Sequence, residues 1–403
     1  MKILIVGGFA PSLVVFRGPL LQSLAAAGHV VAASAADNDI SAAKKLAEWG
    51  VTFIPLPLQR AGLNPWRDLG YLRALRALMR REQPDVVLAY THKPVIYSAL
   101  AAAPLVPAPK VYAMITGLGF AFIGHGPKPW IARQVLQFLY RRAARHFSGM
   151  LFQNPDDHAL FQQLRMAQSK TPQCIVRGSG IDLAFFNFQP YLTGSRLGNV
   201  RFLLIARLLG DKGIREYVAA ARQIKRDHPA AEFHLIGPED PNQAAIPRHE
   251  VEEWQKKGVV RYHGPLYDVR PALKECTVYV LPSYREGTPR TVLEAMATGR
   301  AVIVTDVPGC RETVFDVQGA DATGVRVGRN GLLIPAKSSE ALSAAMRRFI
   351  ADPDLAAQMG TEGRRLAEEH YDVHCVNRQI LGFMGLDRDP ADGSGATVSG
   401  CRN

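Results

Sequence analysis

Two glutamates, Glu286 and Glu294, flank the seven residues GTPRTVL, and this segment follows the apolar run Val278–Leu281. The run predicts a strand. Thr288 and Pro289 predict the start of a helix, because threonine is a good N-cap and proline suits the first helical position. A helix start at the carboxyl end of a strand offers N–H groups and a helix dipole to an anion, such as a diphosphate.

Neither glutamate has metal-ligand spacing to a nearby His or Asp. Carboxylates without a metal are suited to accept hydrogen bonds from sugar hydroxyls, so the pair would hold sugars on either side of a diphosphate. The alternative is a surface glutamate beside an ordinary capped helix. The helix start and its place at the end of a strand favour the binding site.

A second candidate is the turn ARLLGDKGI (206–214), which follows the strand-like run Arg201–Ile205. Arg207 and Lys212 are suited to neutralise a diphosphate, including one that departs during a reaction. Gly213 lets the backbone approach closely. Two solvated basic side chains are the alternative, and the predicted anion site in the same half of the chain favours the functional interpretation.

A third candidate is His92 in THKP (91–94), directly after the strand-like run Val86–Ala89. A histidine there would hydrogen-bond a substrate hydroxyl or transfer a proton, and an ordinary structural histidine is the alternative. The turns GGFAPS (7–12) and TGLG (116–119) do not fit the dinucleotide pattern GxGxxG. The DxD pairs at 37–39 and 387–389 are interpreted as solvated loops, so no metal site is predicted.

The charge distribution indicates an anionic partner. The chain has 403 residues and a formal net charge of +12; residues 1–190 hold 20 Lys and Arg against 9 Asp and Glu, and residues 191–403 hold 28 against 27. The sequence has no zinc-finger spacing and no RNA-binding aromatic motif. We therefore expect the anionic partner to be a lipid or a phosphate rather than a nucleic acid. The basic amphipathic stretch Trp130–Phe147 is suited to lie on an anionic membrane, and the alternative is that it packs one face on a sheet.

Strand-like runs alternate with helical patterns along the chain, and the series restarts near residue 200. This predicts α/β architecture: two Rossmann-like domains with parallel sheets facing across a cleft, with ligands at the carboxyl ends of the strands. We expect domains at 1–188 and 198–360, a helical segment at 361–386 that packs back across them, and a disordered tail at 387–403. The five scattered cysteines predict a reduced protein without a zinc site or disulfide frame. No transmembrane span is expected.

The residues resemble those of a known family. EGTPRTVLE matches the EX7E signature of the retaining, GT-B-fold glycosyltransferases of family 4. Three further motifs occur along the chain in the same order as in that family: the Arg207–Lys212 turn, the pair Gly237-Pro238 and the loop HGPLYDV (263–269). Segments of the N-terminal half are similar to those of bacterial members that extend polyprenyl-diphosphate-linked saccharides. These segments are FRGPLLQSL, QRAGLNPW, THKP and TGLG.

The resemblance implies a role for each site residue. Glu294 would bind the ribose and Glu286 the donor sugar, while Arg207 and Lys212 would hold the diphosphate. His92 would lie near the transferred sugar. The remaining nucleotide-sugar contacts would come from Gly8 of the first domain, from the loop residues Gly287, Thr288, Pro289 and Arg290, and from Gly237, Gly264 and Tyr267 near the base. Arg290 departs from the smaller or apolar residues common in the family, and is expected to add a phosphate or acceptor contact or to shape donor choice.

The sequence therefore predicts a retaining glycosyltransferase that needs no cofactor or metal. The donor would be a UDP-hexose or UDP-N-acetylhexosamine, and the acceptor a lipid-linked saccharide in the assembly of lipopolysaccharide, O-antigen, capsule or another bacterial glycan. A cytoplasmic location is expected, with peripheral attachment to the inner face of the membrane. Two alternatives stay open: an epimerase of the same fold, which would turn over UDP-sugar without acceptor, and a non-catalytic sugar-nucleotide binder.

Overall fold

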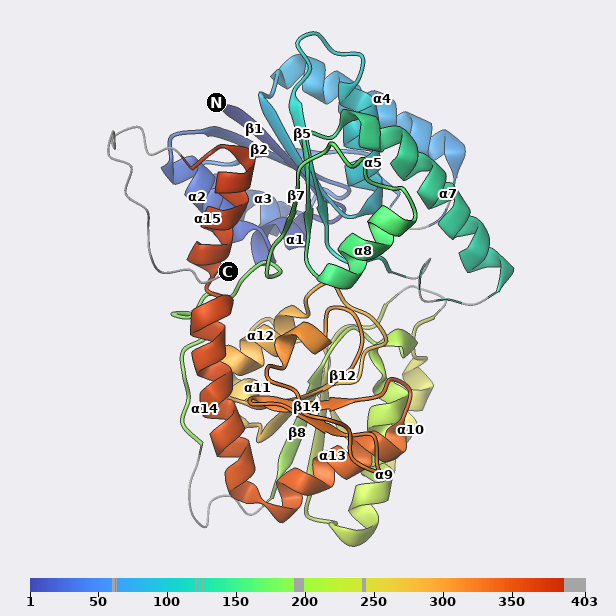
Figure 1. Ribbon diagram of the computed structural model, residues 1–403, viewed down its shortest axis with the longest axis vertical. Helices are drawn as coiled ribbons and strands as arrows, with labels where there is room; N and C mark the ends of the chain where they lie inside the picture. The colour runs from blue at the N-terminus through green and yellow to red at the C-terminus, as the bar shows by residue number, and fades with distance from the viewer. Residues whose placement is uncertain are drawn as a thin grey trace. The chain divides into compact units, whose positions relative to one another are not determined.

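The computed structural model describes residues 1–59, 62, 64–119, 122, 124, 126–191, 199–240 and 244–387. Contacts divide the chain into two compact units (Figure 1). Of the described residues, the first unit comprises those in Met1–Ser179 and in 373–387, and the second comprises those in Gly180–Asp372. The expected domain boundary lay at 188–198, and the contacts change over after Ser179. Most of the expected tail, 388–403, lies outside the described residues.

The first unit is built on a seven-stranded sheet with the order β3-β2-β1-β4-β5-β6-β7. Every pairing in it is parallel. Its strands are β1 (Lys2–Val6), β2 (Val30–Ala35), β3 (Thr52–Pro55), β4 (Val86–Tyr90), β5 (Lys110–Ile115), β6 (Gly149–Phe152) and β7 (Gln173–Ile175). The sequence reverses direction across the sheet between β1 and β4, and in such sheets ligands bind at the carboxyl ends next to that point.

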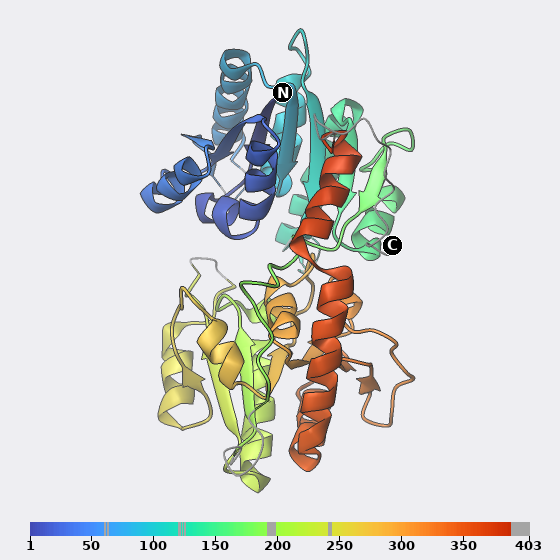
Figure 2. The ribbon, with the colours of Figure 1, turned by 90° about the vertical axis from the view of Figure 1, so that its left-hand side faces the viewer.

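Helices cover both faces of this sheet. One apolar core joins it to α4 (Pro65–Glu82), α5 (His92–Ala102), α7 (Pro127–Ala143) and α8 (Pro155–Gln163). The other joins it to α1 (Ala10–Val15), α2 (Gly18–Ala26), α3 (Ile40–Glu48) and α15 (Val373–Met384). α15 contacts α2 and β6, so a helix from the end of the chain completes this layer (Figures 1 and 2).

The second unit repeats the plan with the order β10-β9-β8-β11-β12-β14-β13. Only the pairing of β13 with β14 is antiparallel among the described strands. The strands are β8 (Arg201–Ile205), β9 (Glu232–Ile236), β10 (Arg261–Tyr262), β11 (Val278–Leu281), β12 (Ala301–Thr305), β13 (Arg326–Val327) and β14 (Gly331–Ile334). One face packs on α9 (Ile214–Asp227), α10 (Arg248–Lys256) and α13 (Ser339–Ala351), and the other on α11 (Arg270–Glu275), α12 (Arg290–Ala297) and α14 (Pro353–His370).

The apolar runs of the sequence form these strands because parallel strands are covered on both faces and need continuous apolar residues. The expected helical segment at 361–386 is divided between two helices: residues 361–370 belong to α14, which packs in the second unit, and α15 packs in the first. No described helix is both long and apolar enough to cross a bilayer.

Candidate functional site

The loop after β11 carries Glu286 at the carboxyl edge of the second sheet. Glu286 Oε1 accepts hydrogen bonds from Lys212 Nζ at 2.6 Å and from Ser283 Oγ at 2.8 Å. The Glu286 amide donates to Pro308 O at 3.0 Å, and Gly309 has φ +85°, where an added Cβ would overlap Glu286 O. The glutamate is therefore held from its side chain and from its backbone.

Lys212 ends a short 3-10 turn, Gly210–Lys212, between β8 and α9. Gly213 follows with φ +68°, and a Cβ there would overlap Pro282 O, so the turn lies directly against the Glu286 loop. Burial by itself lowers the pKa of Lys212, but the charge and hydrogen bond of Glu286 outweigh it and raise that pKa above its ordinary value. The ammonium is thus kept charged in a mostly buried place.

Arg207 lies directly after β8 and is more exposed than Lys212. Its Nη1 donates to Asp240 Oδ2 at 2.7 Å, and its side chain is 54% exposed. The turn after β9 packs against this segment: Gly237 has φ +150°, and a Cβ there would overlap Ala206 O. Asp240 was not singled out from the sequence, because nothing local links it to an arginine 33 residues away.

The helix α12 begins one residue later than predicted. Pro289 is the N-cap, with extended backbone and no side-chain cap, and Arg290 is the first helical residue. The predicted N-cap Thr288 therefore lies in the loop, beside Gly287. Pro289 has no N–H to offer an anion, so backbone donors in this stretch come from its neighbours.

Glu294 and Arg290 are paired within α12. Arg290 Nε donates to Glu294 Oε1 at 3.0 Å, and the Glu294 side chain is 9% exposed. Burial raises the pKa of Glu294, while the charge and hydrogen bond of Arg290 oppose that rise. The structure thus assigns Arg290 a contact with Glu294, which the sequence did not predict.

The loop after β10 borders a cavity of about 650 Å³. The Gly237 amide donates to Gly264 O at 3.0 Å, and Tyr262 Oη donates to Gly237 O at 2.8 Å, so this loop and the turn after β9 are tied together. Tyr267 is fully exposed. The cavity is lined by Leu208, Glu239, Arg248, Val251, Glu252, Gln255, Lys256, Tyr262, Gly264 and Pro265.

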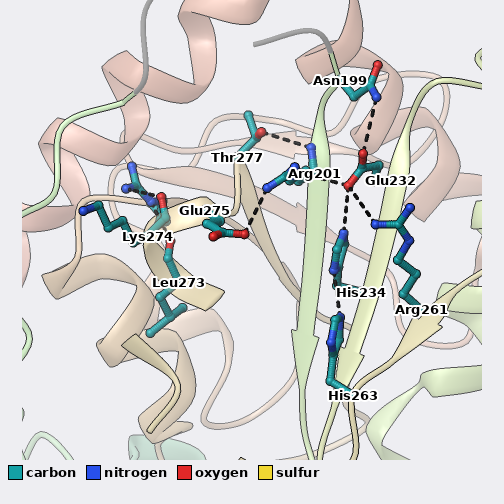
Figure 3. A network of polar contacts seen from close by, with 11 residues as sticks. Asn199, Arg201, Glu232, His234, Arg261, His263, Leu273, Lys274, Glu275 and Thr277 are labelled. Carbon is teal, nitrogen blue, oxygen red and sulfur yellow. Dashed lines mark hydrogen bonds and ion pairs between the residues drawn. The ribbon is translucent and has the colours of Figure 1, made fainter. Parts of the chain in front are cut away.

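A chain of polar contacts leads to this loop along β9 and β10 (Figure 3). His263 Nε2 lies 2.9 Å from His234 Nδ1, and the two rings stack with centroids 5.1 Å apart. His234 Nε2 lies 3.1 Å from Glu232 Oε2. Because a glutamate is a pure acceptor when ionised, His234 donates to it and accepts from His263. The sequence analysis did not single out this network. The signal that could have indicated it is the pair Glu232 and His234, which are two residues apart and therefore lie on the same face of β9.

His92 and Gly8 belong to the first unit, at the carboxyl edge of its sheet. His92 begins α5; its Nε2 lies 2.9 Å from Leu118 O and its Nδ1 2.8 Å from Tyr140 Oη. A carbonyl only accepts, so Nε2 carries the proton and Nδ1 accepts from tyrosine. Burial lowers the pKa of His92. A Cβ on Gly8 would lie 2.9 Å from Oγ1 of Thr91, a non-glycine residue with φ +68°.

The second unit thus brings together Glu286 and Lys212, Glu294 and Arg290, and Gly237 and Gly264. Arg207 lies next to the Gly237 turn, and Tyr267 stands exposed in its loop. Ser283 is a site contact that the sequence analysis missed, although it lies three residues before Glu286. Within the described ranges, no three His, Cys, Asp or Glu side chains gather closely enough to hold a metal ion.

Two family models match the chain. The glycosyl transferase 4-like domain matches residues 15–171, and the glycosyl transferases group 1 model matches 193–366. One similar protein is the N,N'-diacetylbacillosaminyl-diphospho-undecaprenol alpha-1,3-N-acetylgalactosaminyltransferase of Campylobacter jejuni, 27% identical over 91% of this chain and 93% of that protein. Another is the UDP-Gal:alpha-D-GlcNAc-diphosphoundecaprenol alpha-1,3-galactosyltransferase of Escherichia coli, 25% identical over 60% of this chain and 63% of that protein.

Solved structures share the two-domain fold. HepE of Anabaena in complex with UDP has a TM-score of 0.72 at 16% identity, covering 96% of this chain and 100% of that one. Sucrose-phosphate synthase of Thermosynechococcus elongatus has a TM-score of 0.75 at 18% identity, covering 96% and 98%. The predicted GT-B fold class and the predicted glycosyltransferase activity are confirmed, and the epimerase alternative finds no support.

Proposed function

The chain belongs to the glycosyltransferases that join a 4-like domain to a group 1 domain, and from this premise we propose that it transfers a hexose or N-acetylhexosamine from a UDP-sugar to a polyprenyl-diphosphate-linked saccharide. The product would enter bacterial surface polysaccharide or another glycan. Two relatives named for transfer to undecaprenyl-diphosphate saccharides, and UDP in a structural neighbour, support these substrates.

One observation carries the proposal: a mostly buried lysine and glutamate, 2.6 Å apart, lie at the carboxyl edge of the second sheet. In this proposal Lys212 and Arg207 hold the donor diphosphate, Glu286 contacts the sugar to be moved, and Glu294 binds the ribose. Gly237, Gly264 and Tyr267 border the base, and the amides near Gly287, Thr288 and Arg290 add donors. For Gly8 and His92 we carry over from the family resemblance a contact with the donor sugar.

The chemistry follows from charge. Breaking the bond between sugar and diphosphate leaves an oxocarbenium-like sugar and a diphosphate of increased negative charge. Lys212 and Arg207 stabilise that charge where it develops, which is the part that a metal ion plays in other transferases. We propose attack from the face that the diphosphate leaves, with the leaving phosphate taking the acceptor proton. The anomeric configuration is then retained.

We also propose that the protein attaches to an anionic membrane through α7. Trp130, Ile131 and Phe138 are exposed on this helix, and Arg142 lies over the Phe138 ring with 5.6 Å between guanidinium carbon and ring centroid. Ile131 and Phe138 are seven residues apart and therefore lie on one face of the helix, and Trp130 lies about 100° around the axis from Ile131. Exposed apolar side chains beside arginines suit a membrane interface with anionic lipids, where a lipid-linked acceptor resides.

The test is a panel of UDP- and GDP-sugars incubated with polyprenyl-diphosphate-linked saccharides in the presence of EDTA, with the product anomer determined by NMR. We expect UDP release that depends on acceptor and a product with the anomeric configuration of the donor. Glu286→Ala should abolish transfer while the variant remains folded by circular dichroism. Full activity of that variant, an inverted product, or turnover without acceptor would overturn the proposal.

A further inference from the structure

The pair Arg290 and Glu294 differs from an ordinary helix-surface ion pair. Oppositely charged residues four apart on an exposed helix stabilise it only slightly. Here the side chains are 17% and 9% exposed, with Arg290 Nε 3.0 Å from Glu294 Oε1. An arginine on the first turn of α12 also opposes the helix dipole, which favours anions there. Its place is better explained by its contact with Glu294.

Glu294 is buried, with 7% of its surface exposed, on a helix whose residues 292–297 are all buried. An ionised carboxylate in such surroundings is costly unless a cation or hydrogen bonds compensate. Burial accordingly raises the pKa of Glu294, and Arg290 is the cation that opposes this rise.

The elements packed against α12 bring other polar groups. On β11, Tyr279 Oη lies 2.6 Å from Thr291 Oγ1 and 3.2 Å from Ile205 O. On α14, Arg364 donates to Ala297 O at the far end of α12 and pairs with Glu368 at 2.6 Å. The charge next to the Glu294 carboxylate therefore comes from Arg290.

We propose that Arg290 is a positioning residue for nucleotide binding: it keeps Glu294 ionised and fixes its Oε1, so that Oε2 accepts the vicinal ribose hydroxyls. The inference rests on the proposed function, in which Glu294 binds the ribose. It is an alternative to the expected phosphate or acceptor contact, and it follows from the hydrogen bond that Arg290 Nε donates to Glu294. A guanidinium suits the task because it stays charged at any working pH and holds a planar geometry.

The test measures binding of uridine, UMP, UDP and 2',3'-dideoxy-UDP by calorimetry from pH 5 to pH 9. In Arg290→Met, uridine, UMP and UDP should all bind about 10- to 100-fold more weakly near pH 6, the range for a lost hydrogen bond to a charged group. Part of the affinity should return as the pH rises, because Glu294 then ionises without help. Dideoxy-UDP should bind wild type and variant equally.

Three variants sharpen the result. Arg290→Lys should retain part of the affinity. Glu294→Gln should make a second change, Arg290→Met, nearly silent. Arg365→Met is the matched control, because Arg365 forms an exposed i,i+4 pair with Glu369 on α14 at 2.8 Å, and it should leave nucleotide binding unchanged.

Each contrary outcome has a defined meaning. If Arg290→Met weakens UDP but leaves uridine unaffected, Arg290 contacts phosphate and the inference is wrong. An equal loss at every pH for all four ligands would indicate a merely structural role and would also overturn it. If wild type binds none of the UDP ligands, the proposed function itself fails, so the two failures are distinguishable.

Discussion

Lys212 Nζ lies 2.6 Å from Glu286 Oε1, although the two residues are 74 positions apart in the chain. They meet because β8 and β11 are neighbours in the sheet and the turns after them share one edge. In the proposed mechanism, Glu286 keeps Lys212 charged and oriented before the donor arrives. The donor diphosphate must then compete with the Glu286 carboxylate for the Lys212 ammonium. Single and double variants of the two residues can test this competition.

Replacing Lys212 with methionine should damage both activity and stability. We expect kcat to fall by about 10²- to 10³-fold, the usual effect of removing one donor to a developing charge. Stability should fall by about 2 kcal/mol, because Glu286 stays mostly buried without its counter-charge. Steady-state transfer and chemical unfolding measure the two effects.

The double variant Lys212→Met with Glu286→Gln is the control. It removes both charges, so much of the lost stability should return while transfer remains abolished. If the single variant keeps near-normal kcat, Lys212 does not stabilise the leaving group. If the double variant is the least stable of the set, the pair does not act through charge compensation.

The sequence predicted the features that depend on residues near one another in the chain, namely the strands and the turns after them. Continuous apolar runs identified the buried parallel strands, and Gly213 and Gly237 marked turns that only glycine fits, where side chains would overlap Pro282 O and Ala206 O. The turn after each strand held the charged residues of the site. These features depend on residues that are close together in the chain.

What the sequence could not provide were partners that meet through tertiary packing. Asp240 reaches Arg207 because β9 lies beside β8, and His263 stacks on His234 because β10 lies beside β9. The pairing of Arg290 with Glu294 was not predicted, because Glu294 was considered only as a ligand of the ribose.

Gly237→Ala should be strongly destabilising. At φ +150° an alanine is strained, and its Cβ would overlap Ala206 O, so we expect a loss of more than about 3 kcal/mol. Gly264→Ala is the matched control: its φ is +70°, but no atom lies within 4 Å of the added Cβ, so only about 1 kcal/mol of strain is expected. Thermal unfolding compares the two, and equal shifts would contradict the overlap argument.

UDP should stabilise the protein without divalent metal. In the proposed site, Lys212 and Arg207 supply the positive charge, so a protein dialysed against EDTA should still bind UDP. At a UDP concentration 100-fold above Kd, binding adds about 2.7 kcal/mol to the unfolding free energy. A melting temperature that rises only when Mg²⁺ or Mn²⁺ is restored would contradict metal-independent binding.

His92 should make the stability of the first unit depend on pH. Burial lowers its pKa below the ordinary 6.5, so the folded unit binds a proton less readily than the unfolded chain. Stability should therefore fall as the pH drops from about 6.5 and level off below the folded pKa. His92→Gln should remove this component, which appears as the difference between the two unfolding profiles. The exposed His146→Gln is the control and should leave the profile unchanged.

Charge reversal on α7 should weaken attachment to anionic membranes. Each cation near such a surface contributes about 1 kcal/mol, so Arg142→Glu on α7 with Arg145→Glu on the 3-10 turn directly after it should reduce binding to phosphatidylglycerol vesicles by more than about 10-fold. The exposed pair Arg222→Glu with Arg226→Glu on α9 makes the same charge change in the second unit and should have little effect. Phe138→Ser should weaken attachment even at high salt, because it removes apolar contact rather than charge. Flotation with each variant measures binding, and UDP binding to the second unit serves as the folding control. Equal losses for the two charge pairs would show that net charge, and not α7, determines attachment.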